Sequence, residues 1–258
     1  SSETAVAHLG GTPIFIRGDE LQLGRGETIA DTAKIISGYC SALIIRTFAQ
    51  ADVEELGAHA SIPVINALTD DDHPTQLLAD WLTIRENFGK DIAGRKFVYL
   101  GDGNNMSHAW LMMGAIMGAH VVAATPSGKW APDAKVVEIA KIIASKSGGK
   151  VEVSHDPEAA SKDASVLYTD VWMSMGDSES ERDEKVLALS PFAVTENLFS
   201  LTNKDSIFMH CLPAHRGEEV EASVIDGPRS VIWREAYHRR TTIQSLLFHL
   251  TKGDLKGN

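Results

Sequence analysis

The sequence has little of several things, and each scarcity excludes a class of protein. Two cysteines in 258 residues, Cys40 and Cys211, do not make a disulfide framework, so a reducing compartment is expected, with the cytoplasm as the default. Basic residues are outnumbered, with 24 Lys and Arg against 35 Asp and Glu, and the net charge of -11 argues against a nucleic-acid partner. No apolar run approaches the ~20 residues that span a bilayer, which argues against a membrane protein.

What the chain does contain is an alternation of short β-branched runs with helical patterns. The expected strands are "TPIFIR", "ALIIRT", "PVINAL", "FVYLGDG", "HVVAAT", "KVEVS", "VLYTD", "SIFMHC" and "SVIW". Helices are expected between them, and a last helix from about Arg234 to Leu250. Strands that alternate with helices predict an α/β fold of two doubly wound parallel-sheet domains.

Glycine and charge accumulate over residues 88–94, just before a new strand, and this predicts a domain boundary. We expect a first domain over 1–88, a second over 89–233, and a C-terminal helix over 234–258 that returns to the first domain. In open parallel sheets, ligands bind beyond the carboxyl ends of the strands, so the residues that follow each strand are the candidates for function.

Two of these candidates precede the expected boundary. Arg46 ends an apolar strand and is either a surface or salt-bridging arginine or a guanidinium aimed at an anion or carbonyl oxygen. His73 precedes Pro74, which suits the first turn of a helix. It is either the cap of that helix or, together with Gln76, a ligand for a polarised oxygen at the helix N-terminus.

The other candidates follow strands of the second half. "GDGNN" lacks the spacing G-x-G-x-x-G, which excludes NAD, and is either a tight turn with an Asn cap or an amide that contacts a carboxylate. Asp170 precedes "VWMSMGD", which is either an ordinary loop or a lid. Cys211 is either a buried core residue or a functional thiol, although its neighbour His210 points to the opposite face of a strand. The two cysteines lie far apart and no His/Asp cluster has ligand spacing, so no metal site is expected.

Five segments occur together and in this order: "HPTQLLAD", "GDGNN", "DVWMSMG", "HCLPAHRGEEV" and "REAYHRRT". This combination resembles the aspartate/ornithine carbamoyltransferase family over the whole chain from Glu3 onward. "HPTQ" is common to both branches of that family, whereas "SMG" and "HCLP" are typical of the ornithine branch.

The resemblance implies a function and a set of roles. A first domain would bind carbamoyl phosphate and a second L-ornithine, with the active site in the cleft between them, a homotrimer as the catalytic unit, and no cofactor. The catalytic residues would be Arg46, His73, Asp170 and Cys211. Carbamoyl phosphate would contact Arg46, His73, Gln76, Cys211, Leu212, Arg239 and, from a neighbouring subunit, Gln22. Ornithine would contact Asn105, Asp170, Ser174 and Met175.

Two departures from the family pattern leave alternatives open. The family has a Ser-Thr-Arg-Thr-Arg phosphate loop immediately before the segment that matches "SSETAVAHLGG", and this chain begins just after that point. The usual "EAENR" is here "EAYHR", with Tyr237 and His238 before Arg239. The alternatives are a non-catalytic paralogue or fragment that binds amino acid or assembles with partner subunits, and a carbamoyltransferase for another acceptor such as putrescine or aspartate.

Overall fold

The computed structural model describes residues 1–18, 26–90, 92, 94–173 and 178–251. The chain divides into two compact units, the first formed by Ser1–Ala79 and Tyr237–Asn258, the second by Asp80–Ala236. The division falls within two helices, α4 (Pro74–Phe88) and α11 (Ile232–Thr251). The domain limits expected from composition, at 88–89 and 233–234, stay a prediction.

The first unit is built on two parallel strands, β1 (Leu43–Arg46) and β2 (Val64–Leu68). Its helices are α1 (Ser2–His8), α2 (Ile29–Ser37) and α3 (Gln50–His59), together with the parts of α4 and α11 that belong to it. Its core joins Ala5 and Ile65 to Ile243 and Leu247 of α11. The C-terminal helix therefore packs on the first unit, as expected.

One predicted strand of this unit is wrong. The residues of "TPIFIR", 12–17, form no regular element, and they pair with no strand among the described residues. The side chains of Ile14 and Phe15 are 67% and 74% exposed. The run reads as a strand by composition, but a strand also needs a neighbouring backbone, which the composition of one segment does not predict.

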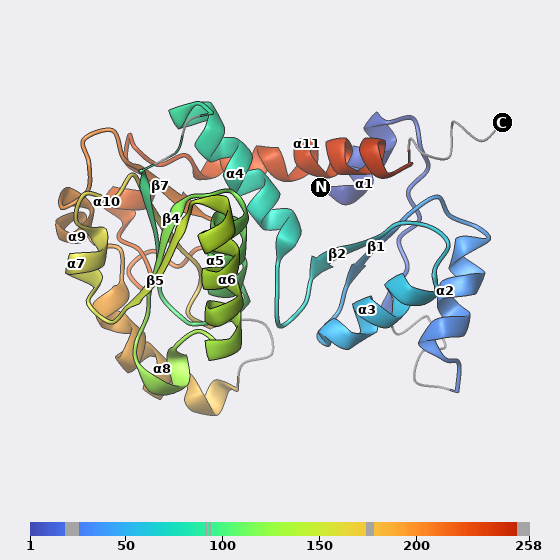
Figure 1. Ribbon diagram of the computed structural model, residues 1–258, viewed down its shortest axis with the longest axis horizontal. Helices are drawn as coiled ribbons and strands as arrows, with labels where there is room; N and C mark the ends of the chain where they lie inside the picture. Colours follow the sequence, from blue (N-terminus) through green and yellow to red (C-terminus); the bar gives the residue numbers. More distant parts are fainter. Residues whose placement is uncertain (19–25, 91, 93, 174–177, 252–258) are drawn as a thin grey trace. The chain divides into compact units, whose positions relative to one another are not determined.

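The second unit contains a five-stranded parallel sheet with the strand order β5-β4-β3-β6-β7 (Figure 1). Its strands are β3 (Lys96–Leu100), β4 (His120–Ala124), β5 (Lys150–Ser154), β6 (Val166–Thr169) and β7 (Ile207–His210). From β3 the chain adds β4 and β5 on one side of the sheet, and it then adds β6 and β7 on the other side. The topological switch point, where such sheets bind ligands, lies between β3 and β6.

Helices cover both faces of this sheet (Figure 1). One face carries α5 (Asn105–Ile116) and α6 (Ala134–Ser147); the other carries α7 (Pro157–Ser161), α9 (Glu196–Ser200) and α10 (Ala222–Ile225). The described part of the second unit also contains α8 (Arg182–Leu189) and the 3₁₀ turns η2 (Gly128–Trp130), η3 (Glu179–Glu181) and η4 (Ser190–Phe192).

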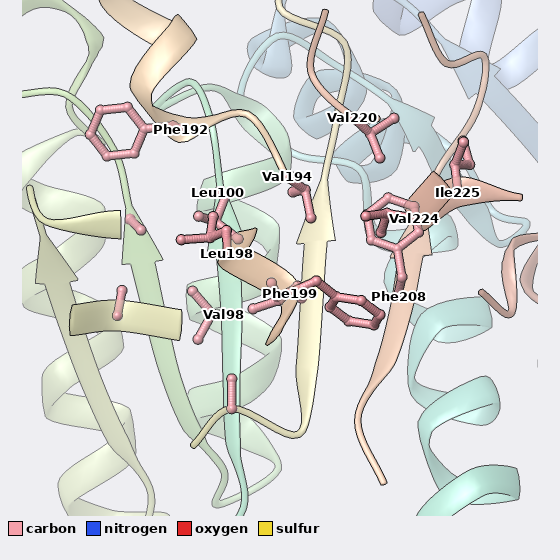
Figure 2. Close-up of a cluster of buried hydrophobic side chains, with 14 of the residues drawn as sticks. Val98, Leu100, Phe192, Val194, Leu198, Phe199, Phe208, Val220, Val224 and Ile225 are labelled. Atoms are coloured by element: carbon pink, nitrogen blue, oxygen red, sulfur yellow. The ribbon is translucent and has the colours of Figure 1, made fainter. Parts of the chain in front are cut away.

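The strands of the second unit contribute apolar side chains to a core on each face of the sheet. Figure 2 shows Val98 and Leu100 of β3 gathered with Leu198, Phe199 and the side chain of Phe208. Odd and even strand positions are both buried, which is typical of parallel sheets covered on two sides.

Among the helices of the described residues, none is both long enough and apolar enough to cross a membrane.

A second predicted strand, "SVIW", is also wrong. Ser230 makes a single bridge to Phe208, and the chain turns into α11 at Ile232. A run of three apolar residues can begin a helix as well as form a strand, so its period cannot separate the two.

Candidate active site

The turn after β3 explains the glycines of "GDGNN". A side chain on Gly103 would lie 2.2 Å from the backbone carbon of Ala131, so only glycine fits there. The next residue, Asn104, caps α5: its side-chain oxygen accepts hydrogen bonds from the backbone N–H groups of Met106 and Ser107. The expected turn with an Asn cap is thus present. The side-chain nitrogen of Asn104 points toward Asp170, at the end of the neighbouring strand β6.

Asp170 lies at the end of β6, on the other side of the switch point, and its carboxylate receives several donors. Its Oδ1 accepts from the backbone N–H of Val171 at 2.8 Å, and its Oδ2 lies 3.4 Å from the Nδ2 of Asn104. The Sγ of Cys211, at the end of neighbouring β7, donates to the same Oδ1 at 2.9 Å. Three strand ends are therefore joined at one buried carboxylate, because parallel strands end at the same edge.

The Cys211 thiol is held in its protonated form. Burial raises its pKa well above the usual value for cysteine, and the negative charge of Asp170 raises it further. A thiol that stays protonated at neutral pH is a poor nucleophile, since the thiolate is the reactive form. The pair therefore presents a carboxylate with an S–H donor beside it, a combination that suits the binding of an amine better than nucleophilic attack by sulfur.

The residues around Cys211 are fixed by buried polar contacts. The backbone N–H of His210 donates to Glu235 Oε2 at 3.0 Å, and the N–H of Leu212 donates to His210 Nδ1 at 2.9 Å. Because Nδ1 is the acceptor, the neutral His210 ring carries its proton on Nε2, which lies 3.3 Å from Oε1 of Glu219. Leu212 has a φ of 58°, which is rare outside glycine, and its bond to Pro213 is cis. The hydrogen bonds to Glu235 and His210 hold the backbone on both sides of Cys211.

A second cluster lies in the first unit, at the N-terminus of α4. Arg239 of α11 donates from Nη1 to the side-chain oxygen of Gln76, and the same nitrogen lies 3.2 Å from Nε2 of His73. Arg46, at the end of β1, acts on His73 through its charge. The structure thus brings together four residues that the sequence singled out from three separate segments.

His73 is neutral and has one nitrogen left to donate. Burial lowers its pKa to about 3, with further contributions from the charges of Arg239 and Arg46. A guanidinium can only donate, so Nε2 accepts and the proton resides on Nδ1. The buried Nδ1 has no hydrogen-bond partner among the described residues, and the same holds for Nε of Arg239. Two buried N–H donors without acceptors are suited to a ligand that brings oxygen atoms.

Some expected site residues cannot be placed, and others were missed. Gln22, Ser174 and Met175 lie outside the described residues. Asn105 begins α5, next to the Asn104 that reaches Asp170. Asn104 was expected only as part of a turn with an Asn cap or as an amide for a carboxylate ligand, not as a partner of Asp170, and Glu235 was not among the expected site residues. The doubled Asn was the one signal for Asn104, and nothing local marked Glu235 as the partner of a strand 25 residues away.

A third missed feature supports the turn after β3. Lys185 of α8 forms an ion pair with Asp102 at 2.6 Å, and the two side chains are only 3% and 10% exposed. The ion pair joins α8 to the "GDGNN" turn, two residues before Asn104. Buried ion pairs depend on both partners, because loss of one leaves an uncompensated charge.

Taken separately, the two clusters define a class of protein. One α/β unit presents guanidinium groups, an amide and a neutral imidazole, which are donors for an anionic group and a carbonyl. The other presents a carboxylate and a thiol, which suit an amine. These two sets of side chains are typical of a group transferase with two small substrates.

The comparisons with known proteins identify the family. The profile of the carbamoyl-phosphate-binding domain of aspartate/ornithine carbamoyltransferases matches residues 1–86, and that of the Asp/Orn-binding domain matches residues 93–250. The chain belongs to the aspartate/ornithine carbamoyltransferase family.

Relatives and solved structures agree with this assignment. An ornithine carbamoyltransferase of Pyrococcus horikoshii is 50% identical over 253 residues, which cover 98% of this chain and 79% of the relative. An anabolic ornithine carbamoyltransferase of Pyrococcus furiosus is 49% identical over 256 residues, covering 99% and 80%. The crystal structures of the ornithine carbamoyltransferases from Pyrococcus furiosus and Gloeobacter violaceus match with TM-scores of 0.92 and 0.85, at 48% and 40% identity; they cover 98% and 97% of this chain, and the chain covers 80% of each.

Proposed function

We propose that this chain transfers the carbamoyl group of carbamoyl phosphate to the δ-amino group of L-ornithine, giving L-citrulline and phosphate, in arginine metabolism. The observation that carries the proposal is the contact between the Cys211 thiol and the Asp170 carboxylate at the switch point of the second unit. It provides one acceptor and one protonated sulfur for a reacting amine. Relatives at about 50% identity that are named ornithine carbamoyltransferases support the choice of acceptor.

Carbamoyl phosphate would be bound by the cluster at the N-terminus of α4. When the amine attacks the carbamoyl carbon, a C–N bond forms and negative charge develops on the carbonyl oxygen. The neutral His73 would donate from Nδ1 to that oxygen, beside the positive charges of Arg46 and Arg239. Donors that are already in place stabilise the transition state, and loss of one such donor typically costs ~3 kcal/mol. Gln76 and the peptide groups of Cys211 and Leu212 would hold the carbamoyl amide.

Ornithine would be bound by the second unit. Asp170 and Cys211 would bracket the δ-amino group and direct its lone pair, because the carboxylate accepts from N–H while the thiol can donate or accept. Asn105, Ser174 and Met175 would bind the remaining polar groups of the amino acid. The C–O bond to phosphate then breaks, and the leaving phosphate takes the proton that the amine loses. All atoms of both products come from the two substrates, so the reaction balances without a cofactor.

We further propose a homotrimer that works in the cytoplasm, in which Gln22 reaches the carbamoyl phosphate of a neighbouring subunit. The first unit exposes several large apolar side chains, among them Phe15, Tyr39 at 82% and Phe48 at 60%. We propose that these side chains lie in the contact between subunits, because contiguous exposed apolar surface is typical of faces that another protein covers. Light scattering should give three times the mass of the chain; a monomer that has full activity would contradict the trimer.

The test of the proposed function is product formation with three acceptors under the same conditions. The 258-residue protein is incubated with carbamoyl phosphate and either L-ornithine, L-aspartate or putrescine, and the carbamoylated product and phosphate are both measured. We expect citrulline and phosphate in equal amounts, with ornithine strongly preferred. A preference for putrescine or aspartate would show that this compound, and not ornithine, is the acceptor. Absence of product with all three would support a non-catalytic paralogue or fragment.

A further inference from the structure

The segment that follows Cys211 contains a tight turn whose polar side chains the proposed reaction does not use. Arg216 and Val220 form a bridge across the turn, the N–H of Gly217 donates to the carbonyl of Val220, and the N–H of Glu218 donates to the carbonyl of His215. Gly217 has a φ of 89°, which allows the chain to reverse there. The turn is thus fixed by its own backbone, independently of any substrate.

Three side chains of this turn converge. His215, Glu218 and Glu219 each offer one ligand atom, and the three atoms lie within 4.8 Å of one another. His215 is exposed, Glu218 is half-buried and Glu219 is completely buried. The cluster therefore has one buried carboxylate at its base and two side chains nearer the surface.

Glu219 supplies a second, independent observation. Its Oε1 accepts from the backbone N–H of His215 and faces the ring of His210, but the buried Oε2 has no hydrogen-bond partner among the described residues. The Nδ1 of His215 lies 3.7 Å from this oxygen, which is too long for a hydrogen bond. A buried carboxylate oxygen without a donor costs free energy, so a native fold that keeps one usually places an ion or a water against it.

We propose that His215, Glu218 and Glu219 bind a divalent cation of the zinc class. One imidazole and two carboxylates suit Zn²⁺ or Co²⁺ better than Mg²⁺ or Ca²⁺, which prefer oxygen ligands alone. Bonds of about 2.0–2.1 Å place ligand atoms roughly 3.3 Å apart around a tetrahedral ion. His215 and Glu218 are at the surface and can close that gap by rotation, while Glu219 stays in place.

Charge balance sets a limit on the affinity. Arg182 of α8 donates to Oε1 of Glu218 at 2.9 Å, so a cation must share that carboxylate with the guanidinium or displace it. Removing the positive charge of Arg182 should tighten cation binding, whereas removing the negative charge of Glu218 should weaken it. Both changes break the same ion pair, so a general loss of structure cannot produce the two opposite effects.

Calorimetric titration of metal-free protein with Zn²⁺ tests the proposal. The titration uses a Cys40→Ser, Cys211→Ser background, because thiolates bind Zn²⁺ by themselves. We expect one Zn²⁺ per chain, an affinity about a hundredfold lower or worse in His215→Ala, a weaker affinity in Glu218→Gln and a tighter one in Arg182→Gln. The matched control is His59→Ala, an exposed histidine at the end of α3, which should leave the affinity unchanged.

Two further measurements keep the outcome clear. Co²⁺ should give visible absorption bands without a sulfur-to-cobalt charge-transfer band, and His215→Ala should abolish them. Urea unfolding without metal should give the same midpoint for the background protein and the His215→Ala and Glu218→Gln variants, which shows that the fold is retained. No binding of Zn²⁺, or binding that His215→Ala and Glu218→Gln leave unchanged, would overturn the proposal and indicate that a water molecule fills the space beside Glu219.

Discussion

Replacing Asp170 by asparagine should make Cys211 more reactive, although the change is made 41 residues away in the sequence. The asparagine keeps the shape of the side chain and an oxygen that can accept the S–H hydrogen bond. What it removes is the negative charge that disfavours the thiolate. Two unit charges at the observed 2.9 Å interact by about 1.4 kcal/mol even at the dielectric constant of bulk water. That energy is a factor of about ten in an equilibrium constant, and the partly buried site should give more.

The assay is the rate of alkylation of Cys211 by iodoacetamide as a function of pH, in a Cys40→Ser background. The thiolate is the species that reacts, so the midpoint of the profile reports the pKa of the thiol and the plateau reports its accessibility. We expect the Asp170→Asn profile to move toward lower pH, with at least a roughly tenfold higher rate in its rising part. An unchanged midpoint, or one that moves toward higher pH, would refute the reasoning about the pair.

Three predictions concern stability. Gly103→Ala should destabilise the protein by about 1–3 kcal/mol in urea unfolding, because the new Cβ meets the backbone after η2; an unchanged midpoint would contradict this. Lys185→Met should lower the free energy of unfolding by about 3–5 kcal/mol, because it leaves the charge of Asp102 buried without a partner. The double variant Lys185→Met, Asp102→Asn should lose less, because the second change removes that charge; losses that simply add would argue against the ion pair. The pKa of His73 is lowered to about 3 in the folded state, from the ordinary value of 6.5. Between these two pH values, His73 binds a proton in the unfolded chain but not in the folded protein. Stability should therefore fall as pH decreases through this window, by up to about 1.4 kcal/mol per pH unit, and His73→Gln should remove that slope.

The positions of the functional strand ends could be predicted from the sequence because of a rule of parallel sheets. Asp170 and Cys211 follow apolar runs, and the carboxyl ends of parallel strands share one edge. The rule required only that the strands be recognised, and the strands that carry Asp170 and Cys211 are short apolar runs that end at polar residues. "TPIFIR" failed because its pairing depends on a neighbour rather than on its own residues.

The contacts inside the site could not be predicted, because they join distant segments. Neither the approach of Asn104 to Asp170 nor the contact between Glu235 and the backbone of His210 leaves a local pattern. The same is true of the protonation states. Cys211 and His73 are shifted by burial first and by neighbouring charges second, and both depend on the packed structure.

The central claim is that the Asp170–Cys211 pair serves the amine, whereas the cluster around His73 serves carbamoyl phosphate. Steady-state kinetics of Asp170→Asn with both substrates varied tests this most directly. The account predicts that turnover to citrulline falls by roughly a hundredfold or more, while the affinity for carbamoyl phosphate changes little. An equal loss of turnover and of carbamoyl phosphate affinity would contradict it.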